Sequence, residues 1–164
     1  MEYISVGIIT VSDKGSKGER EDASGPAIEE MLGRIGGKVG KYVIVPDEKE
    51  QIKAAIIDMS DDLGLNLIFT TGGTGFSHRD VTPEATLEVV EKHVPGIPEA
   101  MRARSLQITP KAMLSRAEAG IRKNSIIINL PGSPKGVREC LEVIMPALEH
   151  GVEILVGEAS ECAR

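Results

Sequence analysis

The most glycine-rich segment of the chain, Thr71–Gly75 (TGGTG), has the composition of an anion-binding loop. Glycines let backbone N–H groups come close to a bound phosphate, and the N-terminus of a following helix favours negative charge. Phe76 follows where a P-loop needs lysine, and His78 stands where a dinucleotide-binding fingerprint needs its third glycine. The segment therefore predicts a nucleotide or phosphate site of another kind, with a plain tight turn as the alternative.

Two aspartates stand where they could hold a hard cation beside such a phosphate. Asp80 follows the glycine-rich loop, and Asp47 follows an apolar segment of strand length. Magnesium takes one or two protein carboxylates together with phosphate oxygens, so this pair predicts a magnesium site. The alternative is that each aspartate only caps a helix or stabilises its first turn.

Two further loops contain groups that could bind anions. The polar segment 12–24 begins with Ser12 and Asp13, and a second glycine turn is formed by Pro131, Gly132 and Ser133. Each pattern is weak by itself, because a solvated loop would have the same composition. Arg79 and Arg116 are expected to form surface ion pairs, which usually contribute little.

The elements that position these loops follow an alternating pattern. Apolar runs of strand length alternate with segments of helical periodicity, which is typical of a parallel sheet with helices on both faces. We expect a three-layer α/β/α fold with a mostly parallel sheet, whose strands cover 3–11, 41–45 and 65–70, with a strand-turn-strand unit over 120–130. Ligands bind beyond the carboxyl ends of such strands. We therefore expect the candidate loops to converge on one crevice.

Residues with capping preferences indicate where the first three helices begin. Pro26 is expected to open the first helix, which two consecutive glycines end. Asp47 and Glu50 have the spacing of a capping box for the second helix. Thr82 can cap the third helix, at the proline that follows it.

The second half of the chain has weaker signals until its last helix. Short helices are expected over 99–106 and 110–115. A long amphipathic helix is expected to cover 137–148, and Pro146 should kink or split it.

Length, charge and hydropathy limit the class of protein. A chain of 164 residues fits one domain, which we expect over 1–157 with a tail over 158–164. The net charge of −6 disfavours nucleic acid and anionic membranes as partners. The apolar runs are shorter than a membrane span, so the cytoplasm is the expected location. Cys140 and Cys162 have neither metal-site nor disulfide-framework spacing.

Several motifs, taken together, resemble one family across nearly the whole chain. TTGGTGFSHRDVTPEAT (70–86), AMLSRAEAGIR (112–122) and INLPGSPKG (128–136) resemble the MogA/MoaB family of molybdenum-cofactor biosynthesis, which includes the G domains of plant Cnx and gephyrin. The N-terminal VSD, SGPAIEEML and VPDE also match, in the family's order. One departure is Ser133, where relatives often have Asn or Gln.

The resemblance implies a molybdopterin-binding fold, commonly trimeric, that transfers AMP from Mg-ATP to the terminal phosphate of molybdopterin and releases pyrophosphate. It implies catalytic and magnesium-binding roles for Asp47 and Asp80. It also implies substrate or nucleotide binding by a larger set: Ser12, Asp13, Gly72, Gly73, Thr74, Gly75, Ser115, Pro131, Gly132 and Ser133. Implied partners are molybdopterin, ATP, two further copies of the chain, and a molybdenum insertase that receives the product.

Two other functions remain open at this point. A scaffold could hold molybdopterin or its precursor without chemistry, although such a protein has little reason to keep Asp47 and Asp80 together. A nucleotide hydrolase would turn over ATP without any pterin. The chain has only four aromatic residues, so we expect glycine backbone and polar groups, not stacked rings, to recognise a pterin. Acidic and basic residues nearly balance in the candidate loops, so magnesium would supply the charge that two polyanions need.

Overall fold

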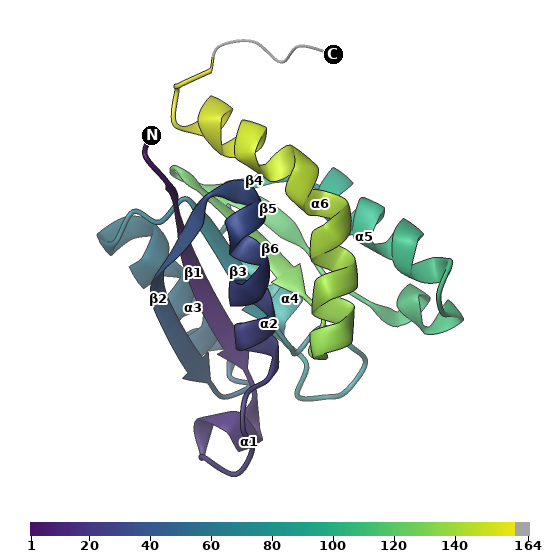
Figure 1. Cartoon of the computed structure of the whole chain (residues 1–164). Helices are drawn as coiled ribbons and strands as arrows, with labels where there is room; N and C mark the ends of the chain where they lie inside the picture. Colours follow the sequence, from purple (N-terminus) through teal and green to yellow (C-terminus); the bar gives the residue numbers. More distant parts are fainter. Residues whose placement is uncertain (160–164) are drawn as a thin grey trace.

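A six-stranded, mostly parallel sheet forms the centre of the protein (Figure 1). The structure is a computed structural model that describes residues 1–159. The strand order is β2-β1-β3-β6-β5-β4, in which β1, β2, β3 and β6 pair in parallel and β4 and β5 are antiparallel. The bounds are β1 Ile4–Val11, β2 Gly37–Val45, β3 Leu67–Thr71, β4 Lys92–His93, β5 Ala119–Arg122 and β6 Ser125–Leu130.

Helices cover both faces of the sheet. One apolar cluster joins the sheet to α2, α5 and α6, and a second joins its other face to α3 and α4, as the layers in Figure 1 show. The bounds are α1 Asp13–Ser16, α2 Ser24–Met31, η1 Leu32–Ile35, α3 Lys49–Ile57, η2 Asp58–Asp62, α4 Thr82–Val89, α5 Gly96–Leu106, η3 Pro110–Leu114 and α6 Pro134–Leu155. The expected three-layer α/β/α fold is confirmed.

The core is aliphatic, as the scarcity of aromatic residues requires. Phe69 in β3 is the one aromatic side chain in the buried core of the described residues. Every residue of β3 and β6 is buried, because helices cover both faces of these central strands. None of the helices within residues 1–159 is long and apolar enough to cross a membrane.

The predicted helix caps at Asp47 and Thr82 are wrong. Helix α3 begins two residues after Asp47, with Glu48 at the N-cap and no side-chain cap bond. Thr82 lies inside α4, and its hydroxyl donates to the Gly72 carbonyl instead. Both side chains face the strand ends, so local capping preference gives way to tertiary contacts made by the neighbouring loops.

Other boundaries also differ from the sequence predictions. Strand β2 begins at Gly37, four residues before the expected start, because pairing with β1 extends along its full length. The short strand β4 was not predicted, since its two residues are defined only by pairing with β5. Helix α2 begins at Ser24 rather than Pro26, and the segment before it contains the short helix α1.

The last helix is longer than predicted and is not split. Helix α6 continues through Pro146 to Leu155, and Figure 1 shows its axis bending along its length. The backbone N–H groups of Glu158 and Ala159 donate to the Glu153 carbonyl, so the chain stays attached to the helix end there. The rest of the expected tail, together with Cys162, lies outside the described residues.

Asn129 in β6 connects the sheet to the helix that follows the glycine-rich loop. Its side-chain amide donates to the hydroxyl oxygens of Thr70 (3.0 Å) and Thr86 (2.8 Å). Its Oδ1 accepts from the backbone N–H of Glu118. Because the side chain is fully buried, truncation would leave these partners without a replacement from water.

We expect Asn129→Ala to lower the free energy of unfolding by about 2–4 kcal/mol, since a buried hydrogen-bond network is broken. Urea denaturation of the purified variant measures this change. Asn124→Ala, in the exposed turn between β5 and β6, is the matched control and should change the stability little. Equal effects of the two substitutions would contradict the assigned role of the Asn129 amide.

Candidate functional site

The candidate loops meet at the carboxyl ends of β1, β2, β3 and β6, where the strand order reverses between β1 and β3. They line two pockets, not the single crevice expected from the sequence. Two contacts join the loops after β3 and β6: the Thr71 hydroxyl donates to the Pro131 carbonyl (2.6 Å), and the Gly72 N–H donates to the Leu130 carbonyl (3.2 Å). Residues 71–75 and 131–134 of these two loops line both pockets and form a wall between them, which we call the glycine wall.

The carboxylate pocket, of about 450 Å³, contains more than half of the predicted site residues. Of these it is lined by Ser12, Asp13, Asp47, Gly72, Gly73, Asp80 and Gly132. Its other charged side chains are Lys14, Arg20, Glu21 and Asp22. With five acidic and two basic side chains, this pocket is strongly acidic. The charges of all candidate loops, counted together from the sequence, nearly balance, so the sequence alone did not show this excess.

The α5–α6 pocket, of about 590 Å³, lies between α5, η3 and the first turns of α6. The predicted site residues on this side are Thr74, Gly75, Ser115, Pro131 and Ser133. Its charged side chains are Arg102, Lys111, Lys135 and Glu139, and apolar side chains such as Met101 and Ile108 also line it. Three bases against one acid give it the opposite charge to the carboxylate pocket.

Glycine is required at the wall between the pockets. Gly72 and Gly73 have φ angles of +100° and +70°, which L-residues with side chains rarely adopt. A Cβ on Gly72 would overlap the Val11 carbonyl oxygen, and one on Gly73 would overlap the Thr82 hydroxyl. A Cβ on Gly132 would lie 3.4 Å from the Gly72 Cα. This is an ordinary contact distance, so the two turns are neighbours, and glycine is required at positions 72 and 73.

The carboxylates of Asp47 and Asp13 each accept a hydrogen bond from the backbone N–H of the other residue. The Asp47 Oδ2 accepts from the Asp13 N–H (2.9 Å), and the Asp13 Oδ1 accepts from the Asp47 N–H (3.0 Å). Burial raises the pKa of the Asp47 carboxyl, the Asp13 N–H lowers it, and the charges of Asp13 and Asp80 raise it further. The pocket thus concentrates negative charge around Asp47, a condition that a bound cation would relieve.

Arg79 forms the expected surface ion pairs, and these pairs join three loops. Its guanidinium donates to both carboxylate oxygens of Asp13 (3.1 and 2.9 Å) and to Glu48 (2.9 Å). Hydrogen bonding from Arg79 is the main cause that lowers the pKa of Asp13. Arg79 therefore connects the loops after β1, β2 and β3 at the rim of the carboxylate pocket.

The two proposed metal ligands, Asp47 and Asp80, both line the carboxylate pocket. Asp80 Oδ2 accepts from the Ser77 N–H (3.0 Å). For the part of the chain that the structure describes, Oδ1 of each carboxylate receives no hydrogen bond. No group of three His, Cys, Asp or Glu side chains suited to a metal occurs within residues 1–159. The donor set fits magnesium, which completes its shell with phosphate oxygens and water.

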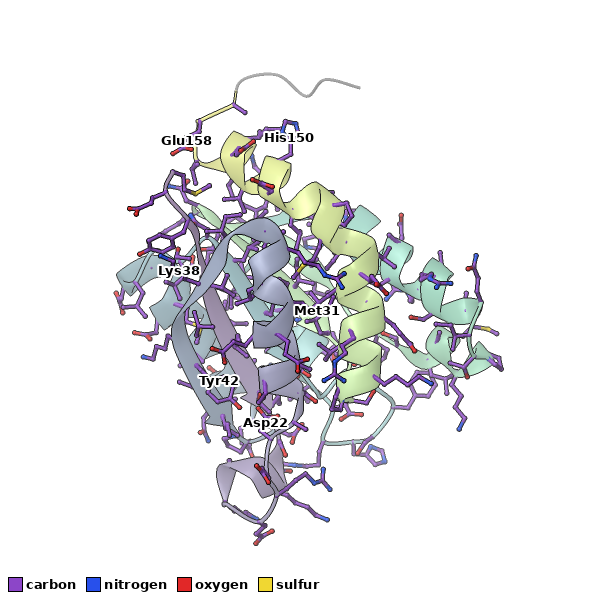
Figure 2. The ribbon with its side chains drawn as sticks, in the orientation of Figure 1. Asp22, Met31, Lys38, Tyr42, His150 and Glu158 are labelled. Atoms are coloured by element: carbon purple, nitrogen blue, oxygen red, sulfur yellow. The ribbon has the colours of Figure 1, made fainter. Side chains whose placement is uncertain are left out.

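Asp22 and Ser24 are site residues that the sequence reasoning did not single out. Asp22 accepts from the hydroxyls of Thr10 and Tyr42 and from the first N–H groups of α2; Figure 2 labels Asp22 and Tyr42 close together, near α1. Burial, followed by hydrogen bonding to Asp22, raises the pKa of Tyr42 to about 12. The Ser24 hydroxyl donates to the Gly132 carbonyl (2.8 Å) and fixes that turn. The sequence could have indicated Asp22, because an aspartate two or three positions before the first N–H groups of a helix is typical of a cap.

The raised pKa of Asp47 predicts a pH-dependent cost in stability. Between the ordinary value of 3.8 and the raised one, the folded state binds more protons than the unfolded state. The cost therefore grows as the pH rises through that interval and is constant above it. Asp47→Asn retains an acceptor for the Asp13 N–H, so we expect this variant to be at least as stable as wild type at neutral pH. Its advantage should shrink on acidification and vanish below the interval.

Urea denaturation at a series of pH values measures this difference. Asp62→Asn, an exposed position in η2, is the control and should change the stability little at any pH. An Asp47→Asn variant that is less stable than wild type by the same amount at every pH would contradict the predicted stability cost of the ionised Asp47 carboxylate.

Comparisons with known proteins agree with this arrangement. The family model described as a probable molybdopterin binding domain matches residues 7–150. The chain is 47% identical over 159 residues to a Helicobacter pylori protein named molybdopterin adenylyltransferase, covering 96% of this chain and 90% of that one. It is 44% identical to gephyrin of Dictyostelium discoideum, covering 92% of this chain and 22% of that protein.

A solved structure supports the same conclusion at the level of the fold. The molybdopterin biosynthesis enzyme MoaB of Thermus thermophilus superposes with a TM-score of 0.89 at 49% identity, covering 94% of this chain and 97% of that one. The resemblance drawn from the sequence motifs is confirmed by these matches. With a family model over most of its length and relatives of this identity, the chain belongs to the MogA/MoaB family of molybdopterin-binding proteins of molybdenum-cofactor biosynthesis.

Proposed function

We propose that this protein transfers AMP from Mg-ATP to the terminal phosphate of molybdopterin. A phosphate oxygen of molybdopterin forms a bond to the α-phosphorus of ATP, and the bond from that phosphorus to the β-phosphate bridging oxygen breaks, so pyrophosphate leaves. The observation that carries the proposal is a pair of pockets on either side of one glycine wall, with Asp47 and Asp80 in one of them. The activity named for the Helicobacter pylori relative supports it.

The opposite charges of the pockets suggest which substrate each one binds. The carboxylate pocket suits a nucleotide whose phosphates carry a cation, since Asp47 and Asp80 would otherwise repel the triphosphate. The α5–α6 pocket offers Arg102, Lys111 and Lys135 to an anion that carries no metal. We assign the nucleotide phosphates to the first pocket and molybdopterin to the second, so that the reacting phosphates meet at the wall.

Positioning and electrostatics are the main sources of catalysis in this scheme, as in other phosphoryl chemistry. Magnesium, when bound by Asp47 and Asp80, would offset the charge that grows on the leaving pyrophosphate. Backbone N–H groups of Gly73–Gly75 would orient a phosphate in line for attack, since the Gly72 N–H already donates to the Leu130 carbonyl. Ser12 and Asp13 border the nucleotide side, while Thr74, Ser115 and Ser133 offer hydroxyls to the pterin side. No general base is required.

The remaining expectations from the resemblance are also part of the proposal. We expect residues 1–157 to act as one molybdopterin-binding domain that assembles into a trimer, which light scattering at several concentrations tests. We expect the protein to work in the cytoplasm and to pass its adenylylated product to a molybdenum insertase.

Asp80→Ala is expected to lower pyrophosphate release by about 100-fold or more, because the substitution removes a ligand that places charge at the reacting phosphates. The assay uses molybdopterin, labelled ATP and magnesium, and binding of molybdopterin alone should remain measurable. Near wild-type turnover by the variant would contradict the role of Asp80. A wild-type protein that releases no pyrophosphate above blank would instead support the scaffold, and ATP turnover without pterin would support a hydrolase.

Ser105→Phe tests the pocket assignment, because Ser105 lines the α5–α6 pocket. The added ring occupies space needed by the substrate there, so we expect the KM for molybdopterin to rise by about tenfold or more, with ATP affinity unchanged. Ala103→Phe, on the exposed side of α5, is the control and should alter neither. Weaker ATP binding with an unchanged KM for molybdopterin would reverse the assignment.

A further inference from the structure

Arg116 binds both ends of the loop that carries Asp80. Its Nε donates to the Gly75 carbonyl (2.8 Å) and its Nη2 donates to the Asp80 carbonyl (2.9 Å). Its backbone N–H donates to the Thr74 carbonyl (2.9 Å). One planar group therefore bridges the end of the glycine-rich loop and the backbone of the aspartate.

The segment between these two carbonyls forms a closed turn of its own. The Asp80 N–H donates to the Ser77 carbonyl (2.9 Å), and the Asp80 Oδ2 accepts from the Ser77 N–H (3.0 Å). This turn fixes the Asp80 carboxylate relative to residues 77–80, but not relative to the glycine wall. Two groups make that second connection: Thr82, whose N–H and hydroxyl donate to the Gly73 and Gly72 carbonyls, and the Arg116 guanidinium, which acts on the Asp80 backbone itself.

Glu84 holds the guanidinium in place. Both of its carboxylate oxygens accept from the Arg116 Nη1 (2.8 and 2.9 Å). Glu84 lies in the first turn of α4, where negative charge is favoured by the helix dipole. Neither Arg116 nor Glu84 lines either pocket, so both act behind the site rather than on a substrate.

We propose that Arg116, oriented by Glu84, is a positioning residue that places the Asp80 carboxylate against the glycine wall for metal and nucleotide binding. The surface ion pair expected from the sequence is present between Arg116 and Glu84, and the proposal gives it a positioning role. The inference rests on the proposed function, because it concerns the carboxylate assigned there to magnesium.

Lysine cannot replace arginine in this arrangement. A guanidinium presents donors in a fixed plane, so it can reach two carbonyls and a carboxylate at once. The ammonium group of lysine keeps the positive charge but carries its donors on one atom. Arg116→Lys therefore separates the effect of geometry from the effect of charge.

The test is Mn²⁺ binding in the presence of α,β-methylene-ATP and without molybdopterin, followed by the EPR signal of free Mn²⁺. We expect Arg116→Lys to raise the dissociation constant of Mn²⁺ by about 10-fold to 100-fold, the effect usual for residues that orient metal ligands. Glu84→Gln should raise it less, since both carbonyl contacts of Arg116 remain possible. High magnesium should partly restore the rate of pyrophosphate release by Arg116→Lys.

Arg122→Lys is the matched control. Arg122 also binds a carboxylate and a backbone carbonyl, those of Asp61 and Val89, but it lies away from both pockets. It should leave Mn²⁺ binding within about twofold of wild type, because it orients no ligand. The thermal unfolding midpoint of each variant reports any general loss of stability.

Several outcomes would overturn the positioning role. These are wild-type Mn²⁺ affinity in Arg116→Lys, or an equal loss of affinity in Arg122→Lys. If Arg116→Lys does not fold, wild-type affinity in Glu84→Gln overturns it. Failure of the proposed reaction is recognised separately. A wild-type protein that binds Mn²⁺ and the nucleotide analogue but releases no pyrophosphate refutes the proposed reaction. The comparison of Mn²⁺ affinity between wild type and Arg116→Lys still decides the positioning role in that case.

Discussion

The crowding at Gly72 and Gly73 is the constraint on which the site depends. A Cβ on Gly72 would overlap a carbonyl oxygen of β1, and one on Gly73 would overlap the Thr82 hydroxyl. The Thr71 hydroxyl and the Gly72 N–H also donate to the Pro131 and Leu130 carbonyls, so the loops after β3 and β6 approach each other. This approach is possible because β3 and β6 are adjacent parallel strands that end at the same level. Groups bound on the two sides of this wall can react where both reach its edge, because bond formation needs the reacting atoms about 3–3.5 Å apart with no backbone between them.

The distribution of charge follows from this division. The wall separates an acidic pocket that contains Asp47 and Asp80 from a pocket with three basic side chains. Two polyanionic substrates repel each other in solution, and an enzyme that joins them must compensate charge on both. In the proposed scheme, side chains do this on the basic side and a divalent cation would do it on the acidic side. Burial is the main cause that raises the pKa of Asp47, and the negative charges of Asp13 and Asp80 raise it further.

The sequence predicted the fold well wherever the signal is local and repeated. Aliphatic runs defined the central strands, and the glycine-rich loop was placed correctly at the end of β3. The strand β4 and the first residues of β2 escaped prediction, because pairing with a neighbour defines them rather than composition. The caps expected at Asp47 and Thr82 failed for a related reason: each side chain contacts a loop that is distant in sequence.

The same limit applies to the site. Residue types and motif order indicated which loops matter, but not that those loops form two pockets of opposite charge. The surface ion pair expected for Arg116 is present with Glu84. Its hydrogen bonds to the Gly75 and Asp80 carbonyls were not predicted, because they span more than thirty positions of sequence. Asp22 was overlooked although its spacing before α2 is typical of a cap. Long-range hydrogen bonds that position a loop leave little trace in composition or periodicity.

The central claim is that the two reacting phosphates, bound in different pockets, meet at the edge of the glycine wall. A crystal structure with molybdopterin, magnesium and α,β-methylene-ATP tests it most directly, because the methylene group prevents release of pyrophosphate. The account predicts the nucleotide phosphates beside Asp47 and Asp80, the pterin in the α5–α6 pocket, and the terminal phosphate of molybdopterin facing the α-phosphorus at Gly72 and Gly132. Both substrates on one side of the wall, or a nucleotide whose phosphates lie away from the two aspartates, would contradict it.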